Sequence, residues 1–131
     1  MLRTLPFFYE NLLPKDSKTL VSKRLDFPYT ITKVRIDFAR ETRKKLQIKV
    51  FVSNDDEVPS SGEPHGYNVF HDFSQAEYVV GDEPLEVDVG FKVKRQGTYI
   101  KVYGNNTDTF PKTIDVKVTI DMPEEYVPGI D

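Results

Sequence analysis

The sequence contains no cysteine and no tryptophan. Without cysteine the chain forms no disulfide, offers no thiolate to a metal ion and has no cysteine nucleophile. No apolar run approaches the ~20 residues that a membrane-spanning helix needs, and the first residues, Met1 to Pro6, do not resemble a signal peptide. We therefore expect a soluble, cytoplasmic protein that is not exported and does not enter a membrane.

The 131 residues are 38% hydrophobic and 12% aromatic, which suits one domain with a substantial core. The formal net charge of −3 gives no general attraction to nucleic acid, so no nucleic-acid partner is expected. Residues 1–53 hold 12 Lys/Arg and 5 Asp/Glu, whereas residues 54–131 hold 6 and 16. This asymmetry favours head-to-tail association of copies, unless strands from the two halves interleave and mix their charges.

Residues 85–106 carry the clearest alternation of apolar and polar side chains in the chain. Such an alternation predicts a strand with one buried and one solvated face. The apolar row of this strand is Leu85, Val87, Val89, Phe91 and Val93. A turn follows at Gly97, which accepts a positive φ, and a second strand is predicted over residues 98–103. We predict that the two strands form a β-hairpin.

Other segments show the same period, with turn residues between them. Strands are predicted over residues 19–27, 31–40, 46–53, 67–73, 77–80 and 113–122. The segments 31–40 and 46–53 are separated by a short charged turn and are predicted to be antiparallel neighbours. Residues 3–13 contain Pro6, which has no backbone N–H, and are predicted to be an edge strand or an arm.

The fold class that these segments predict is all-β. Seven to eight strands with no helical periodicity fit a single-domain antiparallel β-sandwich of the jelly-roll or Greek-key type, occupying residues 1–131. The N-terminal arm (about residues 1–13) and the C-terminal tail (about residues 123–131) are candidate assembly segments.

The longest polar stretch, residues 54–66, is a candidate ligand loop, because long loops in compact domains are often functional. It opens with four oxygen-bearing side chains: Asn54, Asp55, Asp56 and Glu57. These could bind Ca²⁺, although the spacing of a calcium-binding loop is absent and an ordinary solvated turn is the alternative. His65 and His71 lack helical metal-ligand spacing, so no metal site and no cofactor is predicted.

No catalytic motif is present, and we predict that the protein is not an enzyme. Glu86 and Asp88 share one face of a predicted strand, about 7 Å apart. That separation would suit the two carboxylates of a glycosidase, but the polar face of any strand produces such pairs.

Aromatic residues at predicted surface positions indicate contacts between subunits, where aromatics are favoured. Tyr99, Lys101 and Tyr103 alternate with Ile100 and Val102 and are expected on the outer face of their strand. The remaining interface candidates are Phe7, Phe8, Tyr9 and Tyr126. Stacking of sugars or bases on such a face is the other interpretation.

The strand order and turn style of FPYTITKVRIDF, LQIKVFVSNDD and GTYIKVYGNN resemble the galactose-binding-like jelly-roll domains. The resemblance covers residues 18–121 and implies a sandwich whose ligand loops lie at one end. A carbohydrate site would then use residues 54–66 and 104–112. The sugar-contacting Arg and Trp positions of that family have no counterpart in this chain.

The segments LPFFYENLLPKDSKTL, DFPYTITKVRIDF and IKVYGNNT resemble small accessory proteins of phage particles. This resemblance implies a single sandwich domain on a capsid, neck or tail that works by contact alone. The leading hypothesis is therefore a structural subunit of a virion whose partners are copies of itself and other particle proteins. A carbohydrate-binding module is the alternative.

Overall fold

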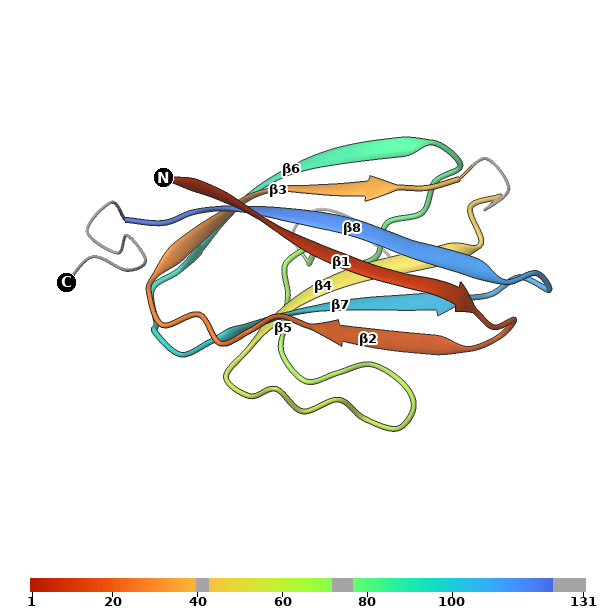
Figure 1. Cartoon of the computed structure of the whole chain (residues 1–131), viewed down its shortest axis with the longest axis horizontal. Helices are drawn as coiled ribbons and strands as arrows, with labels where there is room; N and C mark the ends of the chain where they lie inside the picture. Colours follow the sequence, from red (N-terminus) through yellow and green to blue (C-terminus); the bar gives the residue numbers. More distant parts are fainter. Residues whose placement is uncertain (40–42, 72–76, 124–131) are drawn as a thin grey trace.

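The computed structural model describes residues 1–39, 43–71 and 77–123, and these residues form two β-sheets packed face to face (Figure 1). The strands are β1 Leu2–Leu12, β2 Ser17–Val21, β3 Tyr29–Asp37, β4 Leu46–Ser53, β5 Tyr67–Asn68, β6 Pro84–Val93, β7 Tyr99–Asn106 and β8 Lys112–Asp121. In the described segments there is no helix of the length and hydrophobicity needed to cross a bilayer. The prediction of an all-β sandwich is confirmed.

Sheet A has the strand order β1-β8-β3-β6, and sheet B has the order β2-β7-β4-β5. All pairings are antiparallel, and the first strand pairs with the last, the second with the seventh, and so on inward. Leu2 faces Asp121, and Val52 faces Tyr67. The chain is thus one long ribbon folded at residues 54–66 and then rolled up, which is the jelly-roll arrangement.

Two strand pairings expected from the sequence are wrong. β6 and β7 do not form a hairpin, because β6 lies in sheet A and β7 in sheet B. The same holds for β3 and β4. The connection around Gly97, whose φ is +76°, therefore carries the chain from one sheet to the other. A rolled ribbon makes sequence neighbours face each other across the core instead of pairing.

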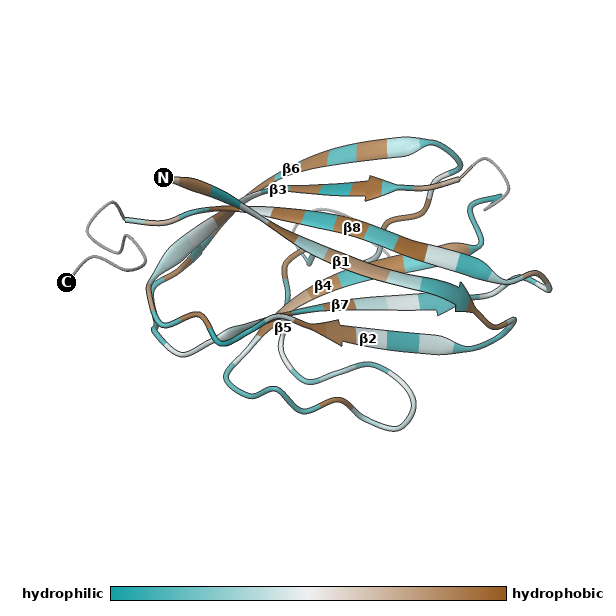
Figure 2. Cartoon of the chain, viewed as in Figure 1, coloured by the Kyte–Doolittle hydropathy of each residue, from teal (hydrophilic) through white to brown (hydrophobic). Residues whose placement is uncertain are grey.

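The core is formed by the inward rows of both sheets. In β8 the alternation is complete, with Ile114, Val116, Val118 and Ile120 inaccessible to solvent. Figure 2 shows the same alternation of hydrophobic and hydrophilic residues along the strands of sheet A. The apolar rows of the predicted strands 31–40 and 46–53 are buried at Val34, Ile36, Phe38, Leu46, Ile48 and Val50. Val52, the last residue expected in the second row, is partly buried.

The predicted core row of β6 is only partly right. Val87 and Val93 are buried, whereas Leu85 is 38% exposed. A register shift lies between the Phe91–Ile31 and Asp88–Lys33 pairs, and Gly90 within it has a φ of +68°. The alternation continues through this β-bulge, because Val89 and Phe91 pack against the core and are partly buried. β6 is an edge strand, so the row is covered less completely than the rows of the inner strands.

Residues 2–12 are the edge strand β1 and are integral to the sandwich, so the edge-strand prediction for this segment is confirmed. Phe7 and Leu12 of this strand lie in the core, with exposed fractions of 5% and 2%. Pro6 is tolerated here because an edge strand hydrogen-bonds on one side only. Of the predicted C-terminal tail, residues 124–131 lie outside the described part of the chain.

Candidate assembly surface

The outer face of sheet B is covered by residues 54–66, which leave β4 and fold back beneath the sheet (Figure 1). Phe51 of β4 and Tyr103 of β7 point to this face and are buried. Gly66 lies so close to β4 that a Cβ atom there would be 2.8 Å from the Val52 carbonyl oxygen. Lys49 and Glu63 form an ion pair between strand and loop.

Lys101 of β7 holds this loop. Its side chain is fully buried, and its ammonium donates hydrogen bonds to Asp55 Oδ1 at 2.9 Å and to the Glu57 carbonyl at 2.8 Å. A buried ammonium is stable only when it is paired and hydrogen-bonded, which the loop supplies. The hydrogen bond from Lys101, together with the backbone N–H of Glu57, lowers the pKa of Asp55 below its ordinary value.

The candidate ligand loop therefore has a structural role in the monomer. Asp55 and the Glu57 backbone serve Lys101, while the side chains of Asn54, Asp56 and Glu57 are exposed. In the described segments no three His, Cys, Asp or Glu side chains come together as a metal site. That this loop binds no metal ion stays a prediction.

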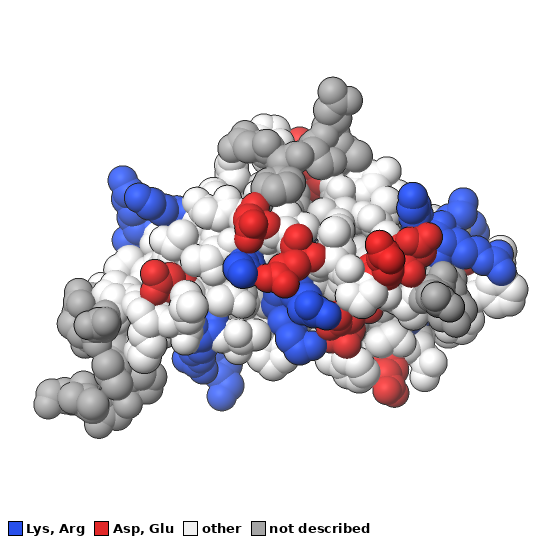
Figure 3. All heavy atoms as spheres, turned by 90° about the horizontal axis from the view of Figure 1, so that it is seen from above, with Lys and Arg blue, Asp and Glu red and all other residues white. Residues whose placement is uncertain are grey.

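The outer face of sheet A is a ladder of surface ion pairs instead. Lys33 pairs with Glu86 at 3.1 Å, and Lys117 pairs with Asp37 at 3.2 Å. Figure 3 shows acidic and basic side chains intermixed near the middle of the surface that it views. The hydrogen bond to Glu86 raises the pKa of Lys33. Each of these two pairs joins a residue of the basic half, residues 1–53, to a residue of the acidic half, residues 54–131. Strands from the two halves therefore alternate in sheet A and mix their charges.

Glu86 is thus a partner of Lys33 and, at 3.8 Å, of Arg35. A carboxylate neutralised by two cations on an open strand face has the environment of a surface ion pair. The pair Glu86 and Asp88 therefore fits the non-catalytic interpretation, and the absence of enzyme activity stays a prediction.

Several strongly exposed apolar side chains lie on and next to β1, the strand at the free edge of sheet A. Leu2 and Phe8 of β1 are 67% and 57% exposed, and Leu13, just after the strand, is 60% exposed. β1 pairs with β8 on one side, and none of the described strands pairs with the backbone groups along its other side. An edge strand that is long and apolar is a template for pairing with another chain.

The structure sorts the seven interface candidates. Phe7, Lys101 and Tyr103 are buried within the chain itself, with exposures of 5%, 0% and 7%, so they do not offer a contact surface. Phe8 is exposed, and Tyr9 and Tyr99 are partly exposed. Tyr126 lies outside the described residues. The expectation that Lys101 and Tyr103 are exposed on the outer face of β7 is wrong, because both side chains are buried. A subunit contact through the exposed candidates stays a prediction.

A groove of 390 Å³ runs between β1 and β2, the edge strands of the two sheets. Leu5, Phe7, Leu25 and Phe27 are among the apolar residues that line it, and Arg3, Lys23 and Arg24 supply positive charge. No aspartate or glutamate is among its lining residues. The groove therefore combines an apolar floor with a basic rim.

The opposite side of the sandwich is closed by aromatic stacking. The rings of Tyr67 in β5 and Phe91 in β6 lie 5.1 Å apart and are nearly parallel, at 14°. Tyr67 also meets the His71 ring edge-on, and His71 Nδ1 lies 2.7 Å from Glu77 Oε1. Between β1 and β2 the ring contact is instead that of the Lys18 ammonium, 5.0 Å above the Tyr9 ring.

A polar recess of 250 Å³ lies between residues 58–62 of the loop and residues 16–19 of the β2 region, with Tyr9 at its side. Lys18 sits 5.0 Å above the Tyr9 ring and covers that ring face. None of the residues 104–112 lines this recess, so it is not the two-loop carbohydrate site expected from the sequence. Carbohydrate binding stays a prediction.

The basic residues of the groove, Arg3, Lys23 and Arg24, were not among the site residues predicted from the sequence. The signal was a pair of adjacent cations, Lys23 and Arg24, directly after a strand. Their proximity to Arg3 could not be predicted, because it depends on β1 and β2 lying on the same side of the sandwich.

No family model matches the chain, and no curated protein matches it. Solved structures with a similar course of the chain include turnip yellow mosaic virus, at 10% identity and a TM-score of 0.34, over 93% of this chain and 80% of that chain. Infectious bursal disease virus Gx strain matches at 6% identity and 0.36, over 95% and 33%. Dimeric latent PorU from Porphyromonas gingivalis matches at 9% and 0.35, over 92% and 13%. These likenesses concern the fold alone.

Proposed function

We propose that this protein is a non-enzymatic structural subunit of a virus or phage particle, as a capsid-decoration, neck or tail component. It works by contact with copies of itself and with other particle proteins. The observation that carries the proposal is the open edge of β1, with the exposed side chains of Leu2 and Phe8 beside a strand edge that has no partner. A second chain placed there would bury apolar surface and extend sheet A.

The jelly roll is compatible with this role, because double-sheet jelly rolls recur in viral capsid domains and in lectins. A fold alone does not assign a function, so the jelly roll does not decide between a capsid-type subunit and a lectin. The open edge of β1 is the feature that favours the subunit. A stable interface buries roughly 1,200–2,000 Å² in total, which a paired edge strand and its flanking side chains can supply.

The test is the mass of the full chain in solution, measured by sedimentation over a range of concentrations. We expect oligomers, and we expect Phe8→Glu to shift them strongly toward monomer. Leu85→Glu is the matched control, because Leu85 is 38% exposed and lies in β6, at the opposite end of sheet A from β1. A wild-type chain that stays monomeric at every concentration would contradict the proposal.

A carbohydrate-binding module is the second candidate, favoured by the polar recess beside residues 58–62. A glycan array, run with and without Ca²⁺, separates the two functions. Selective binding of a sugar by the monomer, lost on Ser17→Trp at the recess wall, would favour the module. Assembly without sugar binding would favour the structural subunit.

A further inference from the structure

The groove between β1 and β2 has the properties of a docking site for an acidic, partly apolar peptide. Arg3 and Lys23 form no ion pair with any described residue, and Arg24 pairs with Asp26 at 2.7 Å. Below them, Leu5, Val21 and Phe27 are partly exposed and supply apolar surface to the groove. Unpaired cations beside apolar surface favour a ligand that brings both carboxylates and apolar side chains.

The chain itself contains such a segment. Residues 124–131, EEYVPGID, hold three carboxylates and the apolar residues Tyr126, Val127 and Ile130. In extended form eight residues span roughly 26 Å, which exceeds the roughly 13 Å from Arg3 to Phe7 along β1. We infer that residues 124–131 of one copy occupy the groove between β1 and β2 of a second copy, an inference that rests on the proposed function.

The direction of β8 favours a second copy over the same chain. β8 runs antiparallel to β1, and the Met122 N–H donates to the Met1 carbonyl at 2.9 Å, so the chain leaves sheet A beside the start of β1. To enter its own groove the segment would have to reverse at once and run back along β1. A segment that continues outward meets a neighbouring molecule instead.

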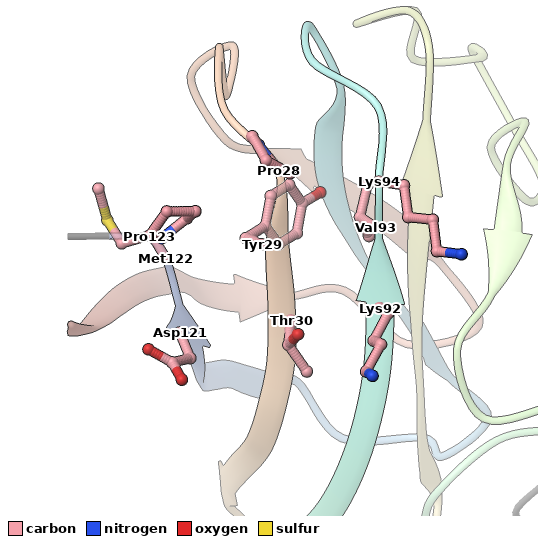
Figure 4. Close-up of a pocket in the computed structure, with 9 residues that line it drawn as sticks. All are labelled: Pro28, Tyr29, Thr30, Lys92, Val93, Lys94, Asp121, Met122 and Pro123. Atoms are coloured by element: carbon pink, nitrogen blue, oxygen red, sulfur yellow. The ribbon is translucent and has the colours of Figure 1, made fainter. Parts of the chain in front are cut away.

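A second basic recess lies where the chain leaves the sheet and provides the matched control (Figure 4). Asp121, Met122 and Pro123 stand on one side of it, and Lys92 and Lys94 of the β6 side stand on the other, with Tyr29 between. This recess is within reach of the same chain's residues 124–131, but Asp121 already brings a carboxylate to it.

The test exchanges charges between separate chains of full length. The groove variant carries Arg3→Glu and Lys23→Glu, and the tail variant carries Glu124→Lys and Glu125→Lys. In the groove variant alone an acidic groove meets an acidic tail, and in the tail variant alone a basic groove meets a basic tail. We expect the association constant of each variant by itself to fall by roughly tenfold or more. An equimolar mixture should recover assembly, because each basic groove then meets an acidic tail and each acidic groove a basic tail. Lys92→Glu with Lys94→Glu should leave assembly unchanged.

A cross-link reports the contact directly, since the chain has no cysteine of its own. Val21→Cys in the groove and Val127→Cys in the tail, placed on the same chain, should form disulfide-linked dimers and larger species on mild oxidation. A Glu86→Cys and Val127→Cys pair is the control, because Glu86 lies on the open face of β6. The control should stay at the mass of one chain.

The outcomes separate this inference from the proposed function. If the charge variants assemble like the wild type and no cross-link forms, the groove contact is wrong while self-assembly stands. A Val21–Val127 cross-link within one chain, with no recovery in the mixture, places the tail in its own groove and overturns the contact between copies. If only the Lys92→Glu and Lys94→Glu variant lost assembly, the tail would bind the second basic recess, beside Asp121, and the groove contact would be wrong. A monomeric wild type contradicts both proposals.

Discussion

The two outer faces of the sandwich handle their charged residues in opposite ways. On sheet B, Lys101 is fully buried beneath residues 54–66, whereas on sheet A, Lys117 stands in solvent with 44% of its side chain exposed. Both lysines occupy outward positions on inner strands, and both have a carboxylate partner, at 2.9 Å and 3.2 Å. The difference is the loop: it encloses Lys101 in a specific buried contact, whereas Lys117 has no such cover and forms a surface ion pair. The loop covers sheet B only, so sheet A and the edge of β1 stay open to partners.

The largest expected effect is that of Lys101→Ala. The change removes the donor to the Glu57 carbonyl and the aliphatic stem that fills the space under the loop. We expect the free energy of unfolding in urea to fall by roughly 2–3 kcal/mol. Lys117→Ala is the matched control and should leave that free energy unchanged, because its pair is exposed. Equal losses in both variants would remove the distinction between the two faces.

The next effect is that of Gly66→Ala, which tests how closely the loop lies on sheet B. A Cβ atom at this residue would meet the Val52 carbonyl oxygen at 2.8 Å, and the φ of +142° is itself unfavourable for alanine. We expect a loss of about 1–2 kcal/mol in the free energy of unfolding. Gly62→Ala shares a positive φ but has nothing within 4 Å, so it should cost less. A larger cost at Gly62 would place the strain in the turn, not in the contact.

A smaller effect is the acid dependence of the Asp55–Lys101 pair. Because Lys101 lowers the pKa of Asp55 in the folded chain, the pair stabilises the fold above the unfolded pKa of about 3.9. That contribution disappears as the pH falls through the lower folded pKa. The difference in free energy of unfolding between wild type and Asp55→Asn should therefore be constant near neutrality and shrink in acid. Asp56→Asn, which changes an exposed carboxylate outside this pair, is the control variant.

The smallest effect is expected on sheet A. Glu86→Gln removes the partner of Lys33 from a fully solvated ladder, where water and salt replace the interaction. We expect the midpoint of thermal unfolding to stay within experimental error of the wild type at both low and high salt. A drop of several degrees that high salt abolishes would show that the open face depends on its ion pairs after all.

Which residues form strands, and which way they face, could be predicted from the sequence. The rows Val34, Ile36, Phe38 and Ile114 to Ile120 have a strict period of two, and burial follows that period directly. The fold class follows from the number of such rows. Alternation is a local property of the chain, so it survives whatever the sheet order is.

Strand partners and covered faces could not be predicted, because they depend on contacts distant in sequence. The period of β6 and β7 fits a hairpin as well as it fits two strands in opposite sheets. Lys101 looked like a surface residue because its cover arrives from residues 55–65, more than thirty positions away. Asn106 looked like a strand end, yet it is fully buried and its amide donates to the carbonyls of Leu12 and Phe110.

The pairing of the first strand with the last has a consequence for the order in which the protein is made. Of the eight described strands a ribosome completes β1 first, and β8, its one partner among them, last. Until β8 has been made, β1 has no strand beside it in sheet A, and both of its edges stay open. A nascent chain that stops before Lys112 leaves β1 without its ladder of hydrogen bonds to β8, so sheet A can form completely only after β8 has been synthesised.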